Sequence, residues 1–298
     1  MQVKQYSQKI FSYLGVLLFF CVLGNAPALF SESKAKQKLA QQKNQRGVRL
    51  YQLNRYAAAL NAFREASEKD PKNAEYPNNA GMCYLQLSRY REAAVLFQKA
   101  SKIKQLPLYY HNLGLAYTGV GKGNAAIQAY QAAVKRKPKY FDAWSRLGLL
   151  LMRKGDLPQA EKALLKASSL KRSYDVENFL GVLYLQQGKL QQAKVKLQRS
   201  ISLNDKFYMS YYNLGVVEQK RNKLLAAEKN YKKCLGLNRE YLYAYYNLAL
   251  VQAKIGRRES AKKSFQIFIK KAPPSMERMV LEAKKRLQSL QEGKYKEL

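Results

Sequence analysis

Apolar and small residues in this chain are spaced for pairs of helices. Within residues 142–174, two groups each fall on one helical face, at offsets of three, four and seven residues. The first group is Trp144, Leu147, Gly148 and Leu151, and the second is Ala160, Leu164 and Ala167. Gly155 lies between them and interrupts the pattern. The segment is therefore predicted to form a helix, a tight turn and a second helix.

The same pattern recurs seven times, at intervals of 33 or 34 residues. A small residue in the second helix marks each unit: Ala59, Ala93, Ala126, Ala160, Ala193, Ala227 and Ala261. Another marks the first helix: Gly47, Gly81, Gly114, Gly148, Gly181, Gly215 and Ala249. Larger side chains at such contacts cost roughly 1–3 kcal/mol through overpacking. A repeat of this length predicts an array in which each unit buries its apolar face against its neighbours.

One position between the two helices of each unit favours a left-handed backbone. It holds Asn54, Ser88, Gly121, Gly155, Gly188, Asn222 and Gly256. Gly and Asn tolerate the conformation that ends many helices. We therefore expect a helix C-terminus and a tight turn at each of these seven positions.

These motifs resemble the tetratricopeptide repeat, whose pattern combines an aromatic residue, Leu-Gly and a later Ala. The unit quoted above shows it, as does a second one: Tyr110, Leu113, Gly114, Tyr117, Ala126, Tyr130, Ala133 and Pro138. Seven units begin near residues 40, 74, 107, 141, 174, 208 and 242 and fill residues 40–275. The resemblance implies an all-α, right-handed α-solenoid of seven helix-turn-helix repeats. A C-terminal capping helix, Met276 to Gln291, is expected within residues 276–298, because Met279, Val280, Ala283, Leu287 and Leu290 form one apolar stripe.

The N-terminal segment does not belong to the repeats. Lys4 and Lys9 precede an apolar run from Ile10 to Gly24, and an Ala-Pro-Ala sequence ends at Ala28. This order is typical of a secretory signal peptide, and the run is shorter than the ~20 residues that a membrane helix needs. We expect residues 1–28 to be removed and residues 29–39 to form a basic linker. The alternative is an uncleaved membrane anchor with cytoplasmic repeats, since basic residues follow the apolar run. Lipidation of Cys21 is disfavoured by the bulky Phe20 before it.

The family resemblance implies that the first helices line a concave groove that binds a partner protein or peptide. The ninth residue of each unit gives an apolar line: Met82, Leu115, Leu149, Val182, Val216 and Leu250. The fifth gives Asn78, His111, Ser145, Asn178, Tyr212 and Tyr246. Met209, Tyr243, Lys220 and Lys254 complete a C-terminal groove that is aromatic with a basic edge. The Lys and Asn of a chaperone-binding carboxylate clamp are missing from the corresponding positions.

Catalysis is not expected from this sequence. His111 is the single histidine, and no Cys or carboxylate cluster has the spacing of metal ligands. Cys83 and Cys234 are interpreted as small buried apolar residues. Gly119 to Gly123 has glycines but neither the preceding strand nor the Lys-Ser/Thr pair of a phosphate-binding loop. We predict no catalytic residue, no metal and no cofactor.

The chain is strongly basic, with 54 Lys and Arg against 20 Asp and Glu and a formal net charge of +34. Much of this charge lies in second helices and turns, which face outward in the expected fold. An excess of this size attracts polyanions. An anionic membrane, lipopolysaccharide or another envelope polymer, or an acidic protein, would fit. Export or membrane tethering argues against nucleic acid.

These observations predict a non-catalytic adaptor of the bacterial periplasm or cell envelope, holding a partner peptide or helix in its groove. The alternative function is polyanion binding through the basic exterior, with an incidental groove. A third is an accessory subunit of an enzyme complex.

Overall fold

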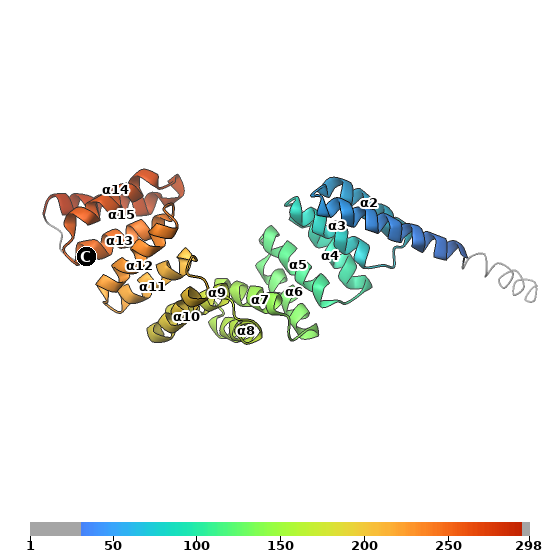
Figure 1. Cartoon of the computed structure of the whole chain (residues 1–298), viewed down its shortest axis with the longest axis horizontal. Helices are drawn as coiled ribbons and strands as arrows, with labels where there is room; N and C mark the ends of the chain where they lie inside the picture. Colours follow the sequence, from blue (N-terminus) through green and yellow to red (C-terminus); the bar gives the residue numbers. More distant parts are fainter. Residues whose placement is uncertain (1–30, 294–298) are drawn as a thin grey trace, which may run out of the picture. The chain divides into compact units, whose positions relative to one another are not determined.

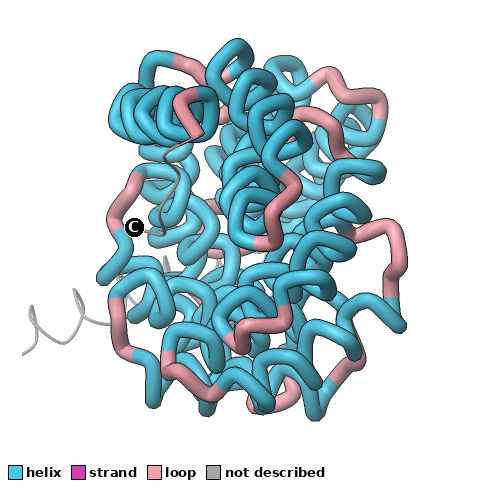
Figure 2. Tube along the Cα trace, turned by 90° about the vertical axis from the view of Figure 1, so that its left-hand side faces the viewer, coloured by secondary structure: helices cyan, strands magenta, loops and turns pink. Residues whose placement is uncertain are grey.

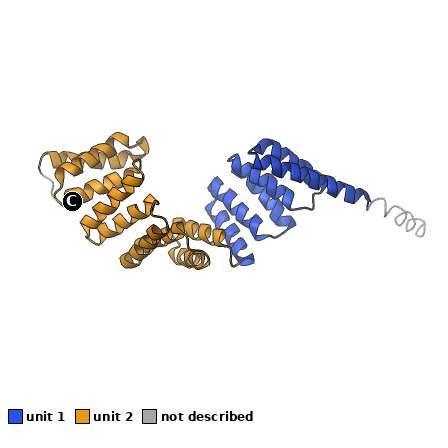
Figure 3. Cartoon of the chain, in the orientation of Figure 1, with its two compact units in different colours: residues 1–137 blue, residues 138–298 orange. Residues whose placement is uncertain are grey.

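The computed structural model describes residues 31–293, and throughout this range helices are joined by short loops (Figure 2). The described residues contain no strand. They fall into two compact units, unit 1 ending at Lys137 and unit 2 beginning at Pro138 (Figure 3). The predicted signal peptide, residues 1–28, lies outside the described residues, as do Cys21 and residues 294–298.

Unit 1 consists of three helix pairs (Figure 1). The pairs are residues 31–52 with α2 (Tyr56–Lys69), α3 (Glu75–Gln86) with α4 (Tyr90–Ile103), and α5 (Pro107–Val120) with α6 (Gly123–Arg136). Each helix packs against the next one along the chain from α2 to α6. Unit 1 is therefore a stack of three repeats.

Unit 2 consists of four further pairs and a closing helix. The pairs are α7 (Phe141–Lys154) with α8 (Leu157–Leu170), α9 (Tyr174–Gln186) with α10 (Leu190–Leu203), α11 (Tyr208–Lys220) with α12 (Leu224–Leu237), and α13 (Leu242–Lys254) with α14 (Arg258–Lys271). A short 3₁₀ turn, η1 (Pro274–Met276), leads into α15 (Glu277–Gln291). The predicted apolar stripe of α15 packs against Phe268 of α14, with Ala283 and Leu290 fully buried. The all-α solenoid and its capping helix are thus confirmed.

The seven expected turn positions all adopt a left-handed backbone. Their φ angles lie between 56° at Ser88 and 87° at Gly155. In each turn the backbone N–H of this residue donates to the carbonyl three residues earlier: at Gly155, for example, to Met152 at 3.0 Å. Three of the positions are not glycine, since Asn54, Ser88 and Asn222 also accept this conformation here.

Small residues permit close packing of the two helices in each repeat. The seven marker alanines of the second helices are all 0% exposed. A Cβ atom added at Gly148 would lie 2.6 Å from Leu164 Cγ, and one at Gly114 would lie 2.7 Å from the Tyr130 ring. The last repeat has Ala249 beside α14, where Phe265 is fully buried. The repeating small residues therefore mark where first and second helices meet.

The start of the described chain differs from the expected linker. Residues 31–39 are helical and continue without a break to residue 52. The segment includes Lys34, Lys36 and Lys38, and Lys favours helices. Lys36 also forms an i,i+4 ion pair with Glu32 at 2.6 Å. Packing begins only at Ala40, which is fully buried against Ala66 and Tyr76. The first helix of the first repeat thus extends beyond the repeat core.

Candidate functional site

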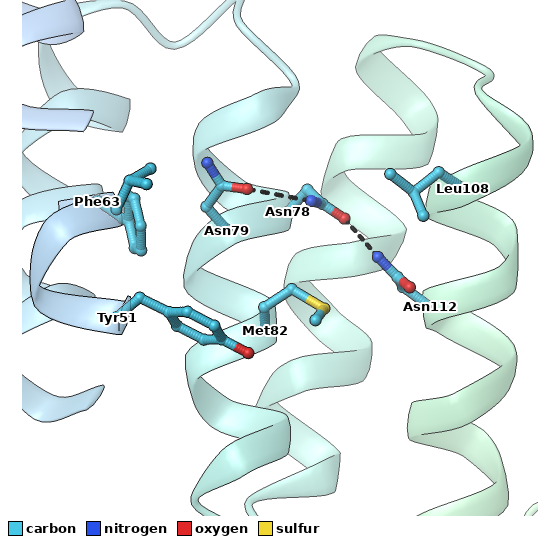
Figure 4. A pocket seen from close by; sticks show the side chains of 8 residues that line it. Tyr51, Phe63, Asn78, Asn79, Met82, Leu108 and Asn112 are labelled. Carbon is cyan, nitrogen blue, oxygen red and sulfur yellow. Dashed lines mark hydrogen bonds between the residues drawn. The ribbon is translucent and has the colours of Figure 1, made fainter. Parts of the chain in front are cut away.

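A pocket of about 330 Å³ lies in unit 1, between the first helices of its three repeats. Its walls are mainly apolar and include Tyr51, Met82 and Leu108 (Figure 4). Leu108 is 47% exposed, which places it at the mouth of the pocket. The side-chain amides of Asn78 and Asn112 lie between these walls (Figure 4).

The amides form one directional chain of hydrogen bonds across the three helices. Asn112 Nδ2 donates to Asn78 Oδ1 at 2.8 Å, and Asn78 Nδ2 donates to Asn79 Oδ1 at 3.2 Å. Asn79 Nδ2 then donates to Asn44 Oδ1 at 3.0 Å. Asn44 Nδ2 donates to Glu75 Oε1 at 3.1 Å, which ends the chain on a carboxylate. Because each amide is held by its neighbour, the polar part of the pocket has a fixed arrangement.

The same bond joins neighbouring repeats in unit 2. Asn213 Nδ2 donates to Asn178 Oδ1 at 2.9 Å, and Asn247 Nδ2 donates to the Tyr212 hydroxyl at 3.0 Å. The sixth residue of one repeat thus binds the fifth residue of the repeat before it. The sequence shows these asparagines in register, but their repeat-to-repeat bond emerges only from the structure.

The pocket carries no formal charge on its lining residues. Burial raises the pKa of Tyr51, and the hydrogen bond that its hydroxyl accepts from Gln86 Nε2 at 3.1 Å opposes only part of this effect. The phenol therefore stays neutral at neutral pH. Among the described residues, no group of three His, Cys, Asp or Glu side chains could hold a metal ion. The pocket offers apolar surface, amide donors and amide acceptors.

The predicted groove residues lie in both units. His111 and Leu115 belong to unit 1, and the other ten belong to unit 2. The apolar line is half-buried at each of its predicted members, which are Met82, Leu115, Leu149, Val182, Val216 and Leu250. Met209 and Tyr243 are 38% and 42% exposed, and Lys220 and Lys254 are also exposed. These residues have surface available for a partner.

Two predicted contact residues are instead part of the core. His111 is 8% exposed and packs edge-on against Tyr130, with ring centroids 5.5 Å apart. Tyr246 is 9% exposed and packs against Phe265 and Phe268, at 6.0 and 5.3 Å. Both rings therefore pack against the second helix of their own repeat and are not available as contact surface.

The aromatic residues of the predicted C-terminal groove mainly contact one another. The ring of Tyr212 lies 4.9 Å from that of Tyr241 and 5.9 Å from that of Tyr231. Tyr241 also packs against Tyr208 at 5.1 Å and Tyr243 at 5.8 Å. In the first two repeats of unit 1 the equivalent fifth residues are the short Asn44 and Asn78, and there the pocket opens. The sequence pattern favoured the aromatic half and did not single out Tyr51 and Leu108, although Leu108 shares its repeat position with Met209 and Tyr243.

Three lysines on the second helices of unit 2 pair with buried carboxylates. Lys194 Nζ lies 2.8 Å from Glu218 Oε1, Lys196 Nζ lies 3.1 Å from Glu177 Oε2, and Lys232 Nζ lies 2.7 Å from Glu228 Oε1. The three acids are only 3–4% exposed. Part of the charge that was predicted to attract polyanions is therefore engaged in ion pairs within the protein.

Comparisons with known proteins agree with the repeat pattern. Models of the tetratricopeptide repeat match residues 44–105 and 111–175, residues 210–241 and residues 243–275. A search of curated proteins found no match. Among solved structures, the crystal structure of MamA is 28% identical, with a TM-score of 0.50, over 53% of this chain and 94% of that chain.

Two further solved structures share the fold. A tetratricopeptide repeat protein from Parabacteroides merdae is 14% identical with a TM-score of 0.65, over 83% of this chain and 99% of that one. YrrB, described as having an unusual peptide-binding site, is 21% identical with a TM-score of 0.52, over 63% of this chain and 97% of that one. Within residues 31–293, no helix has both the length and the hydropathy needed to cross a membrane.

Proposed function

Because this chain belongs to the tetratricopeptide repeat family, whose members are protein-interaction modules, we propose that it is a non-catalytic adaptor that binds a partner peptide. The observation that carries this proposal is the unit 1 pocket with its chain of asparagine amides. We place the peptide across the first helices of unit 1.

An extended peptide fits the chemistry of this pocket. The walls bury apolar side chains, and side-chain amides can pair with the N–H and C=O groups of a peptide backbone. A volume of about 330 Å³ is at the low end of the range for small-molecule sites, roughly 300–1,000 Å³. It is suited to one or two side chains. Since the lining is uncharged, the side chains it accepts are uncharged.

A selection experiment tests this site. The full chain is immobilised and used to select from a random peptide library displayed on phage, in parallel with the Leu108→Arg variant and the matched Leu87→Arg control. Leu108 lines the pocket, whereas Leu87, 40% exposed, does not. Both substitutions add one charge to an exposed position of unit 1.

The expected result is enrichment of peptides with uncharged, apolar side chains on the wild type and the Leu87→Arg control. Leu108→Arg should weaken their binding more than tenfold. If the selected peptides bind the Leu108→Arg variant as tightly as they bind the wild type, the pocket is not the peptide site. If no peptide is enriched on the wild type, the pocket is likewise not a peptide site.

The N-terminal sequence supports a location in the bacterial cell envelope. Its basic start, apolar run and Ala-Pro-Ala site resemble a signal peptide, and an uncleaved anchor would also keep the protein at a membrane. The mass of the N-terminal peptide of the native protein distinguishes the two: a start after Ala28 indicates cleavage, whereas a start at Met1 indicates an anchor.

A second candidate function is polyanion binding by the exterior, as a formal net charge of +34 favours. Salt distinguishes it from peptide binding. Affinity for a polyanion should fall steeply as ionic strength rises, while binding in the uncharged pocket should change little. A polyanion affinity that does not depend on salt would count against this candidate.

A further inference from the structure

The turns between paired helices in unit 2 concentrate exposed cations on one edge, here called the turn edge. It comprises residues 153–156, 187–189, 220–223 and 254–258. Its basic residues are Arg153, Lys154, Lys189, Lys220, Arg221, Lys223, Lys254, Arg257 and Arg258. Its single acid, Asp156, accepts a hydrogen bond from the Gln159 backbone N–H at 3.2 Å and so caps α8.

These turns lie on the same side of unit 2. The first helices of consecutive repeats, α7, α9, α11 and α13, contact one another in that order. Each runs in the same direction within its repeat and ends at its turn. The four turns therefore follow one another along this side, and their basic residues are here called a row.

Several cations of this row are available to a ligand. Arg221 and Arg257 form ion pairs with the buried Glu218 and Glu228. In contrast, Lys220, Lys223, Lys254 and Arg258 are exposed and form no ion pair with any residue between 31 and 293. The helix dipole explains one cation at the C-terminal end of a helix. The last two turns each carry three cations, which is more than the dipole explains.

Apolar side chains accompany these cations. Leu225, next to the turn that ends at Lys223, is 64% exposed. The second helices begin with half-buried leucines at Leu157, Leu190 and Leu224. A basic row with exposed apolar groups suits the boundary between lipid headgroups and acyl chains.

We propose that the turn edge of unit 2 binds the headgroup phosphates of an anionic phospholipid bilayer. This proposal deepens the polyanion-binding candidate by naming its surface and its ligand, and it is independent of the unit 1 pocket. Lys220, Lys223, Lys254 and Arg258 contact phosphates, and Leu225 enters the headgroup layer.

Two variants of the full chain with equal net charge test the location. The edge variant carries Lys220→Gln, Lys223→Gln, Lys254→Gln and Arg258→Gln. The control variant carries Lys166→Gln, Arg199→Gln, Lys229→Gln and Lys263→Gln, which remove four exposed cations from the second helices α8, α10, α12 and α14. Circular dichroism verifies that both remain folded.

Binding is measured by cosedimentation with vesicles of phosphatidylcholine alone and of phosphatidylcholine with phosphatidylglycerol. All variants share residues 1–30, whose Lys4 and Lys9 also favour anionic lipid, so this contribution cancels when the phosphatidylglycerol-dependent affinities of the variants are compared. The edge variant should lose at least tenfold of the phosphatidylglycerol-dependent affinity and the control variant less than threefold, because only the cations of the turn edge lie at the bilayer surface in the proposed orientation.

Each other outcome overturns the proposal. Equal losses in the two variants would show that net charge alone matters. If the wild-type protein does not prefer vesicles that contain phosphatidylglycerol, the proposal is wrong. If it also fails to bind a single-stranded oligonucleotide, polyanion binding as a whole is ruled out as a function. An edge variant that loses oligonucleotide binding but keeps vesicle binding would assign the edge to nucleic acid.

Discussion

The side chain of Asn112 donates a hydrogen bond to Asn78 across the boundary between two repeats, with 2.8 Å between Nδ2 and Oδ1. Both residues are more than nine-tenths buried, at 4% and 6% exposure. The bond thus joins neighbouring first helices at a largely buried position. In the same chain of amides, Asn78 also forms part of the pocket lining.

Removal of this bond should destabilise unit 1. Asn112→Ala leaves the Asn78 acceptor buried without its donor, which costs about 1–3 kcal/mol. Urea unfolding of Asn112→Ala, Asn78→Ala and the double variant measures the coupling. A coupling energy of about 0.5–1.5 kcal/mol is expected. Strict additivity of the two single substitutions would show that the bond adds nothing to stability.

Two glycine-to-alanine substitutions should have opposite effects. At Gly148 the new Cβ would lie 2.6 Å from Leu164 Cγ, whereas at Gly236 of α12 no atom lies within 4 Å. Both gain helix propensity, by up to about 1 kcal/mol. Gly148→Ala also overpacks the contact, at a cost of roughly 1–3 kcal/mol. Gly148→Ala should therefore lower the free energy of unfolding and Gly236→Ala should raise it. A stabilised Gly148→Ala variant would contradict the close approach of the two helices.

The features set by local backbone and residue size could be predicted from the sequence. The left-handed turn at Asn222 favours Asn or Gly, and the close helix contact at Gly148 requires a small residue. The residue type at each position therefore indicates the local backbone or packing. The closing helix was likewise predictable, because Ala283 and Leu290 fall on its apolar stripe.

The location of the open pocket was not predictable in this way. Tyr212 and Tyr246 have the composition of a binding surface, but large rings also fill space, and only the packing shows that they contact Tyr241 and Phe268. The asparagines of unit 1 are a weaker sign of a binding surface than the tyrosines, but their short side chains leave the pocket open. Likewise, the sequence shows the charge of Lys194 but not its buried partner, Glu218.

Stability should depend on pH through Glu228. Burial raises the pKa of this carboxyl, but hydrogen bonds from Lys232 and Arg257 outweigh burial, so its pKa is lowered in the folded protein. A lowered pKa stabilises the fold above the unfolded value of 4.5, and this contribution disappears as the pH falls through the folded pKa. Glu228→Gln should cost about 2 kcal/mol at pH ~7, as expected for hydrogen bonds to a charged group.

The free energies of unfolding of the wild type and the Glu228→Gln variant, compared across pH, show the contribution of the Glu228 carboxylate. Urea unfolding of the wild type and Glu228→Gln should give a difference that is constant near neutrality and shrinks below pH ~4.5. Circular dichroism at each pH verifies that both proteins start folded. If the difference in the free energy of unfolding stays the same down to the lowest pH at which both proteins are folded, the loss of stability does not come from the charge of Glu228.

The two described cysteines should resist alkylation as long as the protein is folded. Cys83 and Cys234 are fully buried, and burial raises the pKa of each thiol to about 12. The reactive thiolate is therefore scarce at pH ~8, and the reagent has no access to the sulfur. Iodoacetamide labelling followed by peptide mass spectrometry should show modification of each site only as it unfolds. Because Cys83 lies in unit 1 and Cys234 in unit 2, labelling through a urea titration reports the opening of each unit separately. Rapid labelling of either thiol without denaturant would show that its helix pair opens in the native state.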